Sequence, residues 1–126
     1  MEIIKQYTVL DAADVEAEAA FWAAVLGGTA RPDLESASGD WRTIVVGGRD
    51  VLGIQLAPDH IRPQWPDGPQ RQQAHLDLCI ADLETAHAEV MGLGAELLQP
   101  AQDPSAQRGF QVYADPAGHP FCLCWE

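Results

Sequence analysis

A change of hydrophobic period that occurs twice, half a chain apart, is the strongest constraint on the fold of this sequence. In residues 73–95, apolar residues first alternate as in a strand and then recur at helical spacing. Asp82 stands where the helix N-cap belongs, and Gly92 and Gly94 stand where the helix should end. Residues 81–84 (ADLE) match residues 13–16 (ADVE), which also lie between a strand pattern and a helix pattern. The chain therefore contains two copies of one supersecondary unit.

Each half of the chain is predicted to have the order β-α-β-β-β. Residues 3–11 alternate as a strand before the first helix, and three strands are predicted after it, at residues 29–35, 41–46 and 51–57. Residues 58–72 carry four prolines and are predicted to be a linker. The sequence thus predicts an α+β fold, with tandem βαβββ modules at 1–57 and 73–126 in a single domain of residues 1–126. The modules are expected to pair across a pseudo-twofold axis, as a curved mixed sheet around a cavity.

Composition narrows the classes of partner. The formal net charge is −12, and nothing resembles a basic stripe, so nucleic acid is excluded as the expected partner. The apolar runs are shorter than a membrane span, and no signal sequence opens the chain, so we expect a cytoplasmic protein without membrane attachment. The three cysteines lack the spacing of a structural zinc site or a disulfide framework.

Three segments carry a family resemblance. They are FWAAVLGG at 21–28, HLDLCIADLETAHAEVMGLGAEL at 75–97 and YADPAGHPFCLCWE at 113–126. Together they resemble the glyoxalase/bleomycin-resistance/extradiol-dioxygenase superfamily, also called the vicinal oxygen chelate fold. The resemblance implies paired βαβββ modules around a cavity. It does not imply one activity, because this fold hosts isomerases, dioxygenases, thiol transferases and non-catalytic drug-binding proteins.

The resemblance also implies where a metal would be bound. Metal-dependent members take one ligand from the first strand and one from the last strand of each module. His75 matches the first-strand position of the second module, and Cys122 matches its last-strand position. The repeat offset of 68 gives Tyr7, and a later offset of 67 gives Gln55. No carboxylate occupies these positions, so no metal or other cofactor is favoured; a divalent metal, if any, would use His75, Gln55 and Cys122.

The alternation of side chains places further polar and aromatic groups on the same faces. Asp77 and Glu126 each lie two residues from a candidate position and would supply a carboxylate if the register differs. Cys122 and His75 are also a conceivable nucleophile–base pair. The expected ligand-binding residues are Tyr7, Trp41, Thr43, Gln55, Trp65, His75, Asp77 and Cys122.

Three functions follow as hypotheses. The first is binding of a small organic molecule, cationic or aromatic, for drug or metabolite sequestration without an obligatory metal. The alternative is a metal-dependent lyase, isomerase or dioxygenase of the same superfamily. The third is an interaction module that self-associates, since exposed sheet edges favour a homodimer.

Overall fold

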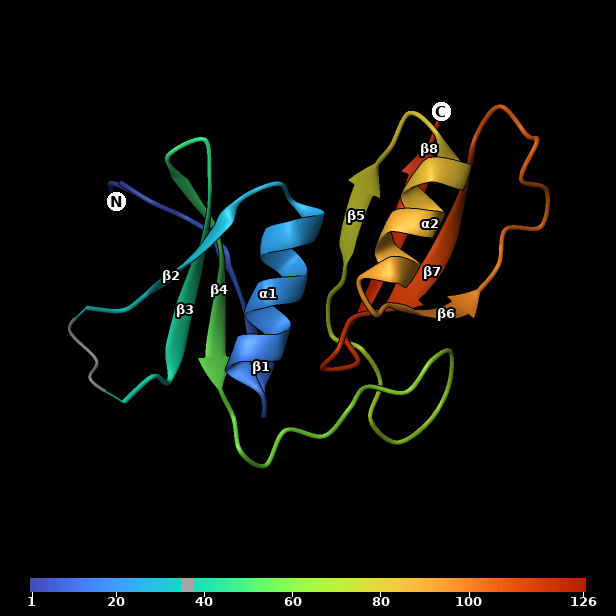
Figure 1. Cartoon of the computed structure of the whole chain (residues 1–126). Helices are drawn as coiled ribbons and strands as arrows, with labels where there is room; N and C mark the ends of the chain where they lie inside the picture. The colour runs from blue at the N-terminus through green and yellow to red at the C-terminus, as the bar shows by residue number, and fades with distance from the viewer. Residues whose placement is uncertain (35–37) are drawn as a thin grey trace. The chain divides into compact units, whose positions relative to one another are not determined.

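Two groups of elements, each with one helix and four strands, follow one another along the chain (Figure 1). The computed structural model describes residues 1–34 and 38–126. It divides into two compact units, Met1–His60 and Ile61–Glu126. The first unit contains β1 (Thr8–Ala12), α1 (Val15–Val25), β2 (Thr29–Pro32), β3 (Trp41–Val46) and β4 (Arg49–Leu56). The second contains β5 (Leu76–Cys79), α2 (Leu83–Gly92), β6 (Glu96–Gln99), β7 (Gly109–Ala114) and β8 (Pro120–Trp125).

Each unit builds one mixed four-stranded sheet. The strand order is β1-β4-β3-β2 in the first unit and β5-β8-β7-β6 in the second. The first and last strands of each unit are parallel neighbours, and the other pairs are antiparallel. The predicted α+β fold of two βαβββ modules is therefore confirmed. The predicted cavity between the modules and the predicted single domain both depend on how the two units are related. Both therefore stay predictions.

The two helices begin where the sequence predicts. Asp14 caps α1 by accepting a hydrogen bond from the Ala17 amide at 3.0 Å. Asp82 caps α2 in the same way, from the Thr85 amide at 2.7 Å. Each side chain satisfies a backbone N–H that has no partner inside its helix. The strand and the helix are thus joined by the same cap in both units.

One face of the first sheet is packed against α1. Ile44, Leu52 and Ile54 on this face are almost completely buried, as is Trp22 of the helix. Glu18 of α1 is also fully buried, and it accepts a hydrogen bond from the Trp22 indole at 3.0 Å. Ala19 and Trp22 are buried on this side of α1, and Glu18 is an acidic residue near the helix N-terminus that is buried with them.

The second sheet buries the corresponding face. Tyr113 and Phe121 lie there fully buried, with stacked rings whose centroids are 5.5 Å apart. The side chain of His87 on α2 is half-buried and lies 2.9 Å from the Tyr113 hydroxyl. His87 is thus a packing residue between α2 and the second sheet.

Residues 58–72 form an irregular segment, as the prolines predict, with one isolated bridge between Gln64 and Arg71. Trp65 is half-buried within it. Within residues 1–34 and 38–126, neither helix has the length and apolar character needed to cross a bilayer.

Candidate functional site

Each sheet has a second face that its own helix does not cover. In the first unit, the buried Leu52 and Ile54 alternate with Val51 and Gln55, which are exposed. Because successive side chains of a strand point to opposite faces, Val51, Gly53 and Gln55 share the open face. The strand pairing puts Thr43 opposite Gly53, and Trp41 opposite Gln55, on that same face.

A pocket of about 520 Å³ lies on this open face, and three sequence-predicted residues line it. Tyr7 precedes β1, while Trp41 and Thr43 come from β3. The Trp41 indole donates a hydrogen bond to the Thr43 hydroxyl at 3.0 Å, which fixes the orientation of the ring. Two aromatic rings and a hydroxyl therefore share one recess.

An ion cluster, which the sequence pattern does not predict, forms one side of the same pocket. Asp50 binds Lys5 through one carboxylate oxygen and Arg31 through both, the latter at 3.0 Å. The hydrogen bond from Lys5 and the bonds from Arg31 hold the pKa of Asp50 below its ordinary value, so it stays ionised at neutral pH. The Lys5 ammonium also lies 4.9 Å from the centre of the Tyr7 ring. The three charged residues lie on separate segments, which only the strand pairing brings together.

The strand register corrects one candidate position. The N-caps match Val9 with Asp77, and these residues pair with Gly53 and Cys122 respectively. The residue equivalent to Cys122 is therefore Gly53, and the assignment of Gln55 by an offset of 67 is wrong. The two helices differ in length by one residue, and the offset of 67 allowed for that difference. The hairpin between β3 and β4 is also shorter than the hairpin between β7 and β8, so one offset does not align the last strands of the two modules. Gln55 lies on the open face, outside the pocket lining.

Gly53 is what allows Trp41 to lie close to the sheet. A Cβ atom at this position would stand 2.6 Å from Trp41 Cζ2 and 3.2 Å from Tyr7 Cε2. These distances are shorter than ordinary van der Waals contact. The rings of Trp41 and Tyr7, which line the pocket, therefore lie directly against the β4 backbone at Gly53.

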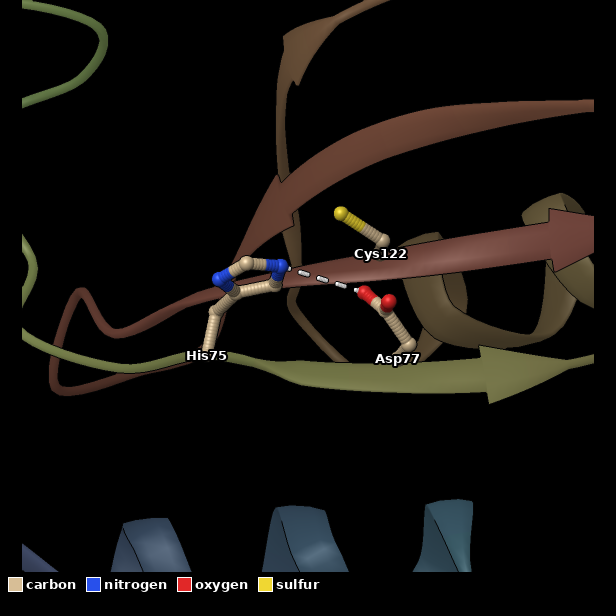
Figure 2. A group of neighbouring side chains, drawn as sticks. All are labelled: His75, Asp77 and Cys122. Carbon is tan, nitrogen blue, oxygen red and sulfur yellow. Dashed lines mark ion pairs between the residues drawn. The ribbon is translucent and has the colours of Figure 1, made fainter.

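The open face of the second unit carries a different group of side chains. His75, Asp77 and Cys122 each place one potential ligand atom within 4.8 Å of the others. His75 Nε2 lies 3.3 Å from the nearer Asp77 oxygen. Figure 2 shows His75 and Asp77 rising from the β5 segment, with the Cys122 thiol of β8 above the pair. The structure thus brings together three of the predicted site residues within one unit.

Cys122 is a neutral thiol at physiological pH. Burial, together with the nearby Asp77 carboxylate, raises the pKa of Cys122 from 9.0 to about 12. A reactive cysteine needs a lowered pKa, since the thiolate is the nucleophile. The environment of Cys122 is therefore the opposite of the one that a Cys–His nucleophile requires.

The residues at the family's ligand positions do not fit the hard divalent ion of its metal-dependent members. Three of these positions hold Tyr7, His75 and Cys122, and the fourth holds Gly53, which has no side chain. A phenol is a poor ligand unless it is ionised, and a buried thiol is a soft donor. Such an ion requires several carboxylates and imidazoles, and this donor set has one imidazole and no carboxylate.

A second pocket, of about 670 Å³, lies on the helix side of the second unit. His87, Gln111 and Trp125 line it, together with the N-terminal turn of α2. Gln111 donates a hydrogen bond of 2.6 Å to the Tyr113 hydroxyl, which also contacts His87. Burial raises the pKa of Tyr113, so this hydroxyl stays protonated. These polar groups satisfy one another, and the pocket includes no sequence-predicted site residue.

Comparison with known proteins gives a consistent assignment. The sequence model of the glyoxalase-like domain family matches residues 7–124. No curated protein matches the chain.

Solved structures with similar folds cover nearly the whole chain. Fosfomycin resistance protein FosX from Listeria monocytogenes has a TM-score of 0.70 and 14% identity, covering 100% of this chain and 95% of that one. A glyoxalase/dioxygenase from Nostoc punctiforme has a TM-score of 0.68 and 18% identity, covering 98% and 91%. A glyoxalase-related enzyme from Fulvimarina pelagi has a TM-score of 0.65 and 20% identity, covering 98% and 89%. At these identities the likeness shows the fold alone.

Proposed function

Because the chain belongs to the glyoxalase-like domain family, whose model matches residues 7–124, we propose that it binds a small organic molecule with an aromatic ring. The pocket on the open face of the first sheet carries this proposal, since Tyr7, Trp41 and Thr43 all line it. Its volume, about 520 Å³, is in the range of about 300–1,000 Å³ that small-molecule sites occupy. The two rings offer stacking surfaces, and the lining supplies polar groups that orient a ligand.

The charge of the lining narrows the ligand class. Lys5 and Arg31 stand against Asp33 and Asp50, so the formal charges around the pocket cancel. A cationic ligand would be attracted by the whole-chain charge of −12, yet it would meet two cations at the pocket itself. A neutral or zwitterionic aromatic molecule fits the local charges better than the cationic ligand that the overall composition suggests.

Binding in this proposal does not depend on a metal of the family's hard type. The reason is the donor set, because the position matching Cys122 in the first unit is Gly53. A metal-dependent lyase, isomerase or dioxygenase is the alternative, and it needs a different set of ligands from the one at these positions. The cluster of His75, Asp77 and Cys122 is the observation that favours this alternative, because its three potential ligand atoms lie close together.

Three further parts of the proposal concern the setting of the protein. Drug or metabolite sequestration is the proposed role, and the fosfomycin resistance protein among the similar folds makes a drug one reasonable ligand to screen. We expect the protein to act in the cytoplasm. We also expect a homodimer, because each four-stranded sheet has two edge strands that can pair with a second copy.

A thermal-shift screen of aromatic compounds tests the proposal. A true ligand at about a hundredfold excess over Kd stabilises the folded state by about 2.7 kcal/mol, which moves Tm by several degrees. We expect the shift to persist in EDTA and to be lost in Trp41→Ala. The control is Met91→Ala, an exposed side chain on α2, which should keep the shift.

Two results would contradict the proposal. If no compound in a broad aromatic set raises Tm, the pocket is not a ligand site of this class. If every shift disappears in EDTA and returns with added metal, the metal-dependent alternative is favoured instead.

A further inference from the structure

The pocket of about 670 Å³ on the helix side of the second unit differs in character from the pocket of the first unit. It is built within the second unit, from the N-terminal part of α2, the loop between β6 and β7, and side chains of three strands. Its volume is in the range of about 300–1,000 Å³ that small-molecule sites occupy. It lies on the helix-covered face of the sheet, whereas His75, Asp77 and Cys122 lie on the open face. It is therefore a separate candidate site.

A series of hydrogen bonds leads from the backbone to this pocket, and its direction is defined. The Ala101 amide donates to Gln111 Oε1 at 3.0 Å. The other end of the Gln111 side chain is therefore its amide nitrogen, which donates to the Tyr113 hydroxyl at 2.6 Å. Tyr113 is fully buried, so its own hydroxyl proton needs an acceptor. That acceptor is His87 Nδ1, which lies 2.9 Å from the hydroxyl oxygen.

These bonds determine which nitrogen of His87 carries a proton. An imidazole nitrogen that accepts a hydrogen bond carries no proton, so the neutral ring of His87 is protonated on Nε2. The two ring nitrogens point in nearly opposite directions, so the Nε2–H group is directed away from the Tyr113 hydroxyl. His87 belongs to the pocket lining, and Tyr113 does not. The ring can therefore offer an N–H donor to an acceptor atom of a ligand in the pocket.

The charged groups and the aromatic ring of the lining favour a cation. Among residues 1–34 and 38–126, the lining includes Asp82 and Glu84 but no lysine or arginine. Asp82 is occupied as the cap of α2 and offsets the partial positive charge of the helix end, so the exposed Glu84 supplies the accessible carboxylate. The Trp125 indole donates a hydrogen bond to the Ala106 carbonyl at 2.9 Å, which holds the ring in place. An indole held in this way attracts both aromatic rings and cations.

We propose that this pocket binds a small aromatic molecule that carries an ammonium group and a hydrogen-bond acceptor. The ammonium group pairs with Glu84, the aromatic ring stacks on Trp125, and the acceptor receives the hydrogen bond from His87 Nε2. The formal charge of −12 on the chain attracts such a cation. This ligand class differs from the neutral or zwitterionic molecule proposed for the pocket of the first unit, so the two proposals depend on different residues.

NMR titration of the full-length protein with three matched probes tests the site. The complete probe is methyl para-(aminomethyl)benzoate. Methyl para-methylbenzoate lacks the ammonium group, and para-methylbenzylamine lacks the ester acceptor. A fragment of this size is expected to bind with a Kd on the order of 1 mM. The complete probe should shift the amide resonances of Leu83 and Ala106 saturably, and each incomplete probe should bind about two- to tenfold more weakly.

Variants with a matched control locate the binding. Glu84→Gln removes the exposed carboxylate of the pocket, so it should weaken binding of the complete probe about two- to fivefold and leave the uncharged probe unaffected. Glu89→Gln changes another exposed acid of α2, outside the lining, and should bind as the unmodified protein does. Trp41→Ala, in the pocket of the first unit, should also leave this binding unchanged. The two proposed sites can therefore fail separately.

The role of His87 has its own readout. NMR of the ring nitrogens should show that the neutral imidazole carries its proton on Nε2. In His87→Leu, the complete probe should lose its advantage over the probe without the acceptor, and this ratio is unaffected by a general loss of stability because both probes meet the same variant. Absence of a saturable shift at millimolar probe would overturn the proposal. So would equal affinity for the uncharged probe, or an equal loss in Glu84→Gln and Glu89→Gln.

Discussion

Glycine at position 53 determines the shape of the open face of the first sheet. With no Cβ, it lets the Trp41 ring lie against the backbone of β4, where a Cβ would come within 2.6 Å of the ring. The second unit has a similar contact between a strand glycine and an indole ring, since a Cβ at Gly109 would lie 2.5 Å from the Trp125 ring. In both cases a strand glycine is covered by an indole ring, which compensates for its missing side chain.

Gly53→Ala should therefore destabilise the protein and disturb the pocket together. The added methyl group must push the Trp41 ring away, and overpacking of this kind costs about 1–3 kcal/mol. Urea unfolding followed by circular dichroism measures the loss. The control is Gly92→Ala, where a Cβ meets nothing within 4 Å, and Ala in a helix is favoured over Gly by about 0.5–1 kcal/mol. Equal stability of Gly53→Ala and the unmodified protein would show that the ring moves without cost.

At this scale, alternation along single strands could be predicted from sequence, and pairing between strands could not. The period of two correctly placed Trp41 with Thr43, and His75 with Asp77, on common faces. Gln55 was assigned to the metal position by counting across hairpins, and hairpin length is not fixed by the repeat. The ion cluster of Lys5, Arg31 and Asp50 was missed because its members gather only through long-range strand pairing.

At the scale of elements, the strand–cap–helix segment is the part that both units share most closely. The pattern was readable because it is local: an aspartate caps each helix three residues from the amide it binds. The helices differ in how completely they are buried. Five residues of α1 are buried, including Trp22, whereas Val90 is the buried residue of α2. On this less buried helix, the half-buried His87 contacts the Tyr113 hydroxyl.

The cap of α2 predicts a pH dependence of stability. Hydrogen bonds from the Thr85 side chain and backbone hold the pKa of Asp82 below its ordinary 3.8. A lowered carboxyl pKa adds stability above the unfolded-state value, and this contribution is lost as pH falls through the folded-state value. Asp82→Ala should therefore be less stable than the unmodified protein at neutral pH, and the difference should shrink below pH 3.8.

Asp82→Asn separates the charge from the cap. Asn keeps an oxygen that accepts the Thr85 amide but does not titrate, so its stability relative to Asp82→Ala should be the same at every pH. Urea midpoints across the acid range measure all three proteins. Glu89→Gln, which removes another exposed acid of α2, controls for general charge. If the stability difference between the unmodified protein and Asp82→Ala were the same at all pH values, the charge of Asp82 would not contribute to the cap.

At the scale of the whole molecule, the repeat predicts the architecture of each half and the pairing of the two halves in one domain. Each unit has about half of the chain, and domains near 60 residues are marginally stable by themselves. Exposed apolar residues also lie on the open faces, including Val9 and Val51 on the first sheet and Phe110 on the second. Burial of these faces would add the stability that a single module lacks. The prediction of one domain over residues 1–126 therefore has a physical basis and a direct test.

Limited trypsin digestion can test this prediction, because the chain has only seven lysines and arginines. In the irregular segment 58–72, Arg62 is followed by proline, which blocks trypsin, so Arg71 is the site open to cleavage there. We expect cleavage after Arg71 to give fragments 1–71 and 72–126 that still co-elute on size exclusion and separate only in denaturant. Arg71→Gln, which should remain uncut in this segment, is the control. Fragments that elute apart in native buffer would instead make the modules two independent domains, since a single shared core cannot be divided without unfolding.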